Sequence, residues 1–151
     1  MRTGPRAVVT STTSPPCVTS TRPCADNERV EPWQMREWFA DYLEACNRHD
    51  LVVLRELIDP AVRRAHQPAG ADAWIADLTE LFAAFPDWRW KRIQLVVEED
   101  RIAAHLRASG THVLSRKHVN VAEFGFFRLA KGRVVEFTGS ADAEALARLS
   151  S

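Results

Sequence analysis

The sequence predicts an α+β domain in which three helices precede a meandering antiparallel sheet and cover one of its faces. Two observations indicate this fold class. Apolar residues recur at helical spacing from Pro32 to Phe85, and they alternate with polar residues after Asp87, as in β-strands. The apolar segments after Asp87 are joined by very short connections, and such connections require antiparallel neighbours.

Length and charge limit the partners that we expect. The chain has 151 residues, and its 20 basic and 20 acidic side chains give a formal net charge of zero. This length predicts one domain. A nucleic-acid surface needs clustered surplus Lys and Arg, and an electrostatic membrane anchor needs a basic face, so we expect neither partner. No group of Cys and His residues has the spacing of zinc ligands, so we expect no metal site.

Residues 1–28 differ in composition from the rest of the chain. They are rich in Ser, Thr and Pro and poor in large apolar side chains. Such a segment buries too little apolar surface to offset the entropy that is lost on ordering. We therefore interpret residues 1–28 as a disordered tail and residues 29–151 as the folded domain. The tail also lacks the apolar stretch of a secretory signal, which makes the cytoplasm the expected location.

Periodicity and a capping residue indicate the first two helices. The first helix begins at Pro32, and its expected buried face consists of Trp33, Phe39, Tyr42, Leu43 and Cys46. Asp50 is a suitable N-cap for a short helix over residues 51–58, which Asp59-Pro60 ends. Residues 62–66 are expected to be extended.

The third helix is expected to begin at Asp72, as its N-cap, and to end at Phe85. Its predicted buried side consists of Trp74, Leu78, Leu81 and Phe82. Four strands then follow, over residues 88–97, 101–114, 118–129 and 133–139. Their expected connections are two-residue turns at Glu99-Asp100 and Arg116-Lys117, and a three-residue loop from Ala130 to Gly132.

The turn at Arg116-Lys117 sets the expected register of the two long middle strands. A two-residue turn pairs Leu114 with Val119, His112 with Val121 and Gly110 with Glu123. This register places the apolar stripes of both strands on one inner face. The last strand is expected to extend that face with Val135, Phe137 and Gly139.

Two ionisable residues, His112 and Glu123, interrupt this otherwise apolar inner face. The expected register makes them diagonal neighbours, with Cβ atoms roughly 6–8 Å apart. Apolar surroundings would raise the pKa of Glu123, and a protonated His112 nearby would oppose that shift. We therefore take both as candidate catalytic residues for acid–base chemistry on an apolar substrate. In the alternative interpretation, His112 lies at the open end of the sheet and Glu123 reaches solvent or pairs with an Arg.

Other positions are candidates for binding. Phe124 and Phe126 lie on an otherwise polar outer face, which suggests contact with a second subunit and hence a homodimer. Glu136 alternates away from the inner face and is expected to pair with Arg128. The candidate substrate-binding residues are Tyr42, His66, Trp74, Trp88, Trp90, Leu106, Gly125, Phe127, Phe137 and Gly139.

A series of short motifs supports a family resemblance. The motifs are Phe85-Pro86-Asp87, Asp100-Arg101-Ile102, Gly110-Thr111-His112, Phe127-Arg128, Gly132-Arg133-Val134-Val135-Glu136 and Asp142. In this order they resemble the SnoaL-like polyketide cyclase family of the nuclear-transport-factor-2-like superfamily, over residues 33–149. The resemblance implies a cone-shaped, cystatin-like fold in which helices and a curved sheet enclose an apolar pocket. It also implies a homodimer through the outer sheet face and a cyclase without a metal or organic cofactor.

The sequence departs from the catalytic pattern of that family. By resemblance, the acid–base Asp falls on Gly139, its partner His on Gly125 and a neighbouring Gln on Glu123. Aldol chemistry is therefore not expected. We hypothesise a cyclase or isomerase that closes a ring in a hydrophobic, polyketide-like substrate of natural-product biosynthesis, with help from Glu123 and His112 or by a pericyclic reaction that depends on shape. The alternatives are epoxide opening, which would need further carboxylates, and a non-catalytic small-molecule-binding module.

Overall fold

The computed structural model describes residues 30–141. The tail predicted over residues 1–28 lies outside the described residues, as do residues 142–151. The described helices are α2 (Pro32–Asn47), α3 (Leu51–Leu57) and α4 (Ala71–Ala84). The strands are β1 (Ile58–Arg64), β2 (Arg89–Glu98), β3 (Arg101–Thr111), β4 (His118–Ala130) and β5 (Arg133–Ala141). The predicted α+β fold class is confirmed.

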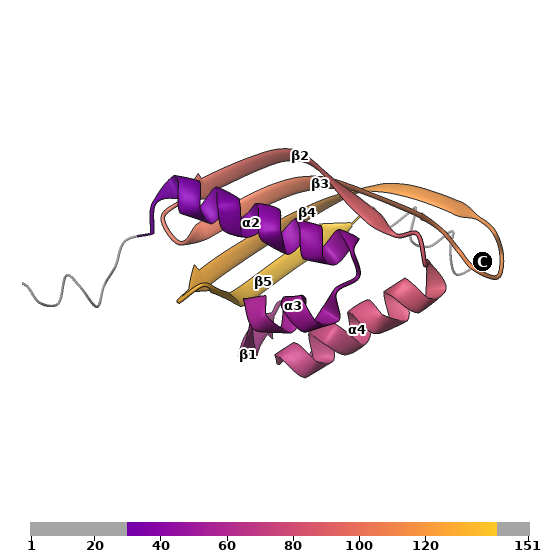
Figure 1. The fold of residues 1–151 in the computed structure, drawn as a ribbon, viewed down its shortest axis with the longest axis horizontal. Coiled ribbons are helices and arrows are strands. Elements are labelled where there is room, and N and C mark those ends of the chain that lie inside the picture. The colour runs from indigo at the N-terminus through magenta and orange to yellow at the C-terminus, as the bar shows by residue number, and fades with distance from the viewer. Residues whose placement is uncertain (1–29, 142–151) are drawn as a thin grey trace, which may run out of the picture. The chain divides into compact units, whose positions relative to one another are not determined.

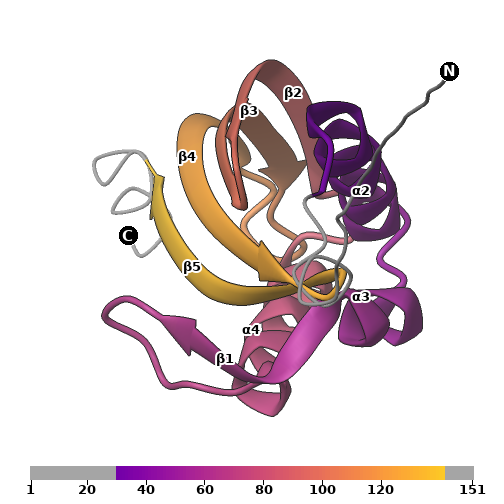
Figure 2. The same ribbon diagram turned by 90° about the vertical axis from the view of Figure 1, so that its left-hand side faces the viewer.

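The five strands form one open sheet in the order β1-β5-β4-β3-β2 (Figure 1). Figure 2 shows that the sheet is strongly curved and that the helices lie on its concave side. Strands β2 to β5 form the predicted antiparallel meander, whereas β1 pairs with β5 in parallel, so the sheet is mixed. The extended segment expected at residues 62–66 is therefore the end of a fifth strand, which begins directly after α3.

Local interactions explain where the helices begin. A capping box holds the start of α2, in which the Glu31 backbone N–H donates to Gln34 Oε1 at 2.8 Å. Asp50 caps α3, as predicted, because its carboxylate accepts from the Val53 N–H at 3.1 Å. Helix α4 begins two residues earlier than expected. Its N-cap is Gly70, which has a φ of 101° that favours glycine, and Asp72 instead pairs with Arg55 of α3.

The buried face of α2 differs from the prediction at one end. The buried residues are Met35, Phe39, Tyr42, Ala45 and Cys46, whereas Trp33 is 62% exposed. The prediction for Trp33 is wrong because this residue precedes Met35 by two positions. Two positions correspond to about 200° around a helix, so the two side chains lie on opposite sides.

The predicted register of β3 and β4 is wrong. The hairpin connection spans residues 112–117, and Thr111 pairs with His118, Gly110 with Val119 and Leu106 with Glu123. Two backbone hydrogen bonds hold this longer connection, from His112 N to Lys117 O and from Arg116 N to His112 O, each at 2.9 Å. The displacement is an even number of residues, so the predicted inner faces are retained while the cross-strand neighbours change.

The connection of β4 and β5 also differs in detail. Lys131 and Gly132 form a two-residue turn with φ values of 53° and 76°, as in a type I′ hairpin. A bulge then places Val134 opposite Leu129, with Val135 outside the ladder. The buried residue is therefore Val134, and the prediction for Val135 is wrong. Beyond the bulge, Glu136 pairs with Arg128 at 2.6 Å, as predicted.

The core between the helices and the sheet has two parts. The larger part joins α2 and α4 to the inner face through residues such as Phe39, Trp74 and Phe127. The smaller part surrounds Trp88, which packs with Phe85 at 5.0 Å between ring centroids. Within residues 30–141, no helix has both the length and the apolar character needed to cross a membrane.

Candidate functional site

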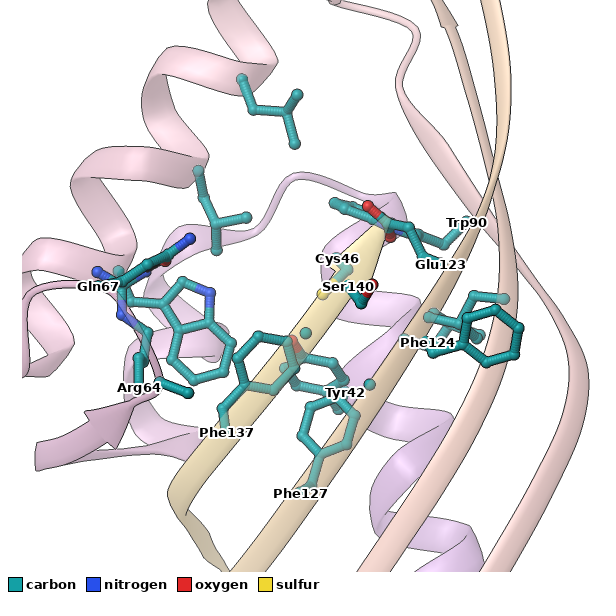
Figure 3. Close-up of a pocket in the computed structure, with 18 residues that line it drawn as sticks. Tyr42, Cys46, Arg64, Gln67, Trp90, Glu123, Phe124, Phe127, Phe137 and Ser140 are labelled. Carbon is teal, nitrogen blue, oxygen red and sulfur yellow. Dashed lines mark hydrogen bonds between the residues drawn. The ribbon is translucent and has the colours of Figure 1, made fainter. Parts of the chain in front are cut away.

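A cavity of about 430 Å³ lies between the helices and the inner face of the sheet (Figure 3). Most of its wall is aromatic or aliphatic. Nine of the predicted site residues line it: Tyr42, Trp74, Trp90, Leu106, Glu123, Gly125, Phe127, Phe137 and Gly139. The remaining lining residues are Leu43, Cys46, Arg64, Ala65, Gln67, Leu78, Leu81, Phe124 and Ser140. A volume of this size suits a small organic molecule.

Glu123 is the one carboxylic acid that lines the cavity among the described residues. It extends from the middle of β4, opposite Leu106, and its Oε2 accepts a hydrogen bond of 2.5 Å from Trp90 Nε1. Burial raises the pKa of Glu123 because the charged form loses its hydration, and the Trp90 hydrogen bond partly offsets this shift. The carboxyl group of Glu123 therefore stays neutral up to a higher pH than a carboxyl group in water.

The backbone of Trp90 is held by Asn47, the last residue of α2. The Asn47 side chain donates to Trp90 O at 2.9 Å and accepts from Trp90 N at 2.7 Å. His49 binds the neighbouring carbonyl of Trp88 at 2.9 Å, and its ring stacks on Phe82 at 3.7 Å. Asn47 is not among the predicted site residues, and its local signal in the sequence is the polar break at the end of the helix.

Tyr42 and Cys46 contribute two further polar atoms from one face of α2. Both residues are buried and line the cavity. Burial raises the pKa of Tyr42 well above its usual value and raises the pKa of the Cys46 thiol to about 12. Both groups are therefore neutral near pH 7, so they can form hydrogen bonds but cannot act as anionic nucleophiles.

A cationic group, Arg64 at the end of β1, lines the opposite part of the cavity (Figure 3). Its side chain is 3% exposed and forms an ion pair of 2.8 Å with Asp77 of α4. Three more of its hydrogen bonds reach the adjoining loop, two to Pro68 O and one to Gln67 Oε1. Arg64 is a second functional candidate outside the predicted set, because its surroundings depend on the parallel pairing of β1.

Three predicted site residues lie outside the cavity wall. His112 lies in the hairpin connection, where its Nδ1 binds Ser115 and its ring contacts Phe85 at 5.3 Å. The expected proximity of His112 to Glu123 is therefore wrong, because the longer connection moves His112 beyond the end of β3. His66 is exposed in the loop after β1, although both of its neighbours line the cavity. Trp88 packs into the smaller core cluster.

Two glycines leave room for Phe137 at the centre of the cavity. Gly125 and Gly139 are cross-strand partners. A Cβ atom at Gly139 would lie 2.6 Å from Cζ of Phe137, and one at Gly125 would lie 3.3 Å from Cε1 of the same ring. Phe137 itself packs between Trp74 and Phe127, at 4.7 Å and 4.9 Å. The Phe137 ring therefore covers Gly125 and Gly139, the two positions that by resemblance correspond to the catalytic His and Asp of SnoaL-like cyclases.

The described residues do not assemble a metal site. From Val30 to Ala141, no three His, Cys, Asp or Glu side chains lie close enough together to hold an ion.

The curved open sheet and the cavity between it and the helices define a nuclear-transport-factor-2-like fold of the SnoaL type. The chain belongs to the SnoaL-like polyketide cyclase family, because residues 36–148 match the model of that family. A search of curated proteins gave no match.

Solved structures show the same fold. IdmH from Streptomyces antibioticus has 27% sequence identity and a TM-score of 0.68, over 78% of this chain and 99% of IdmH. TsrD from Streptomyces laurentii has 20% identity and a TM-score of 0.72, over 79% and 96% of the two chains. A SnoaL-like polyketide cyclase from Agrobacterium tumefaciens has 22% identity and a TM-score of 0.68, over 78% and 98%.

Proposed function

We propose that this protein is a cyclase or isomerase that closes a ring in a hydrophobic, polyketide-like substrate without a cofactor. Family membership supports the general class, and IdmH is an inferred polyketide cyclase. The observation that carries the proposal is the carboxyl group of Glu123, the one carboxyl group among the described residues of a largely apolar cavity wall, where Trp90 fixes its orientation. A substrate carbonyl that enters this cavity can approach Glu123 only in a few orientations, because aromatic and aliphatic side chains form most of the wall.

In this proposal Glu123 acts mainly as a hydrogen-bond donor. Oε2 accepts from Trp90, so the other oxygen carries the proton in the neutral form and can donate to a substrate carbonyl. That hydrogen bond withdraws electrons from a conjugated double bond and assists the addition of a diene in the same molecule. Two carbon–carbon bonds form as the double bonds rearrange, and no net proton transfer is required. The aromatic walls hold the folded conformer that reacts.

The cavity is less suited to the alternative of epoxide opening. That chemistry uses more than one carboxylate around a water molecule, whereas Glu123 is the one lining carboxylate among the described residues. Incorporation of oxygen from labelled water into a product would favour epoxide opening over ring closure.

The proposal is tested with linear polyketides that carry a conjugated diene and a distant enone. Ring closure removes the diene absorbance, and chiral chromatography reports which stereoisomer forms. We expect the wild type to give one stereoisomer faster than buffer does, and Glu123→Leu, which removes the donor, to lower turnover about 100-fold. Near-normal turnover of Glu123→Leu would exclude a role for the carboxyl group and favour catalysis by shape. The absence of acceleration across the series would favour a binding module.

We also propose that two copies of the chain associate through the outer face of the sheet. Phe126 is 58% exposed on this face, and Phe124 and Val96 on the same face are also exposed. His105 stacks on Phe124 at 4.6 Å, which extends the flat aromatic surface. An exposed apolar group of this kind is typical of a contact with another protein surface.

A further inference from the structure

The cavity has two chemically different ends. Figure 3 shows Arg64 and Gln67 on the side of β1 and α4, and Glu123 with Trp90 across the cavity. Phe137 lies between these ends. Among the described lining residues, Arg64 is the one cation and Glu123 the one carboxylic acid.

The charge of Arg64 is only partly matched within the protein. A buried guanidinium is stable when its charge is paired and its donors are satisfied. Its ion-pair partner, Asp77, has a side chain that is 53% exposed. Water therefore screens the carboxylate of Asp77 and weakens its attraction to Arg64. On the other side, the positive charge of Arg64 faces the apolar cavity, where electrostatic interactions are stronger.

The hydrogen bonds of Arg64 leave one donor available. A guanidinium has five N–H groups. Nε and one N–H of Nη2 bind Pro68 O, and Nη1 binds Gln67 Oε1 and Asp77 Oδ2. The second N–H of Nη2 has no acceptor among residues 30–141. The ring of Trp74 lies 5.8 Å from Cζ and covers one face of the group, so a ligand would meet its edge.

Gln67 adds a second donor at the same end. Its Oε1 accepts from Arg64, which brings its amide nitrogen next to the guanidinium, and both residues line the cavity. Two adjacent donors, one of them cationic, match the two oxygens of a carboxylate.

We propose that the Arg64–Gln67 end of the cavity binds a carboxylate, so that the substrate is an apolar molecule with a free carboxylic acid at one end. This inference rests on the proposed ring-closing function and deepens it. An anionic group at Arg64 would orient the substrate, because the aromatic wall and Glu123 offer it no other cationic partner. The apolar part would then extend along Phe137 toward Glu123.

The test uses two probes that differ in charge but hardly in shape, naphthaleneacetate and naphthaleneacetamide. Their affinities for the full-length protein are measured at pH 7 by quenching of tryptophan fluorescence, since Trp74 and Trp90 line the cavity. We expect the carboxylate to bind roughly tenfold tighter than the amide, as a charge-assisted hydrogen bond would give. Arg64→Met should remove this preference and leave the affinity for the amide within about twofold.

A second variant has the opposite expected effect. Asp77→Asn removes the anion that competes for Arg64, so it should increase the preference for the carboxylate. If Arg64 served only to hold the loop in place, both variants would lower the affinity for both probes by the same factor.

Three results would overturn the carboxylate site. The first is equal affinity of the wild type for the two probes. The second is an equal loss of affinity for both probes in both variants. The third is no binding of either probe. The first two results leave the ring-closing proposal intact, because neither concerns Glu123. If Arg64→Met does not fold, as judged by circular dichroism, the increase expected for Asp77→Asn still decides between the two roles.

Discussion

Trp90 on β2 donates a hydrogen bond of 2.5 Å to Glu123 on β4, across the intervening strand β3. Two opposing effects therefore act on one carboxyl group. Burial favours its neutral form, and the indole N–H favours its charged form. Burial has the larger effect, so the pKa of Glu123 is raised.

Removal of the indole donor should raise the pKa of Glu123 further. We expect this for Trp90→Phe, because phenylalanine keeps the ring and loses the N–H. The measurement is a carboxyl carbon NMR titration of the protein. His112→Ala is the control, since His112 lies in the hairpin connection and binds Ser115 instead. A shift in His112→Ala, or none in Trp90→Phe, would contradict the geometry described above.

Glu123 should also make the free energy of unfolding depend on pH. Its pKa in the folded protein lies above the ordinary value of 4.5. As the pH rises from 4.5 through the raised pKa, the unfolded chain loses this proton first and the wild type loses stability. Over that pH interval, the free energy of unfolding of Glu123→Gln should therefore rise relative to that of the wild type. Below the interval, the difference between the two proteins should stay nearly constant with pH.

Urea denaturation at a series of pH values measures this difference. Glu80→Gln is the matched control, because Glu80 is exposed on α4 and its carboxyl stays in water. A difference between Glu123→Gln and the wild type that stays constant from pH 4 to pH 8 would refute the predicted linkage.

Gly139 should tolerate no side chain while Phe137 keeps its position. We expect Gly139→Ala to lower the free energy of unfolding by about 1–3 kcal/mol, because its Cβ would overlap the Phe137 ring. Phe137→Leu in the same chain should recover part of this loss. Denaturant unfolding of the two single variants and the double variant gives the coupling. If the changes in the free energy of unfolding are additive, the ring does not contact the side chain at residue 139. Ser140→Ala serves as the control at the neighbouring position.

The outer sheet face should hold two copies together. Sedimentation equilibrium of the wild type should give twice the mass of one chain, and Phe126→Lys should give the mass of a single chain. Val52→Lys is the control, because Val52 is 75% exposed on α3, away from the sheet face. The proposal fails if the wild type sediments as one chain, or if both variants behave alike.

Sequence patterns with a short period were sufficient for much of the fold. Alternation along the strands placed Leu106, Glu123, Gly125 and Phe127 on the correct face, because a register displacement by an even number of residues preserves that face. Helical spacing likewise placed Tyr42 and Trp74 in the core. The predicted two-residue turn at Arg116-Lys117 is wrong because backbone hydrogen bonds around His112 hold a longer connection in its place.

The fold class, the apolar inner face and the position of Glu123 on that face follow from local sequence patterns, since they depend on periods of two and 3.6 residues. The partners of Glu123 and the cationic end of the cavity depend instead on contacts between distant elements. Trp90 reaches Glu123 across one strand, Asn47 fixes Trp90 from a helix, and Arg64 enters through the parallel pairing of β1. These contacts join residues far apart in the chain, and no local period encodes such distances.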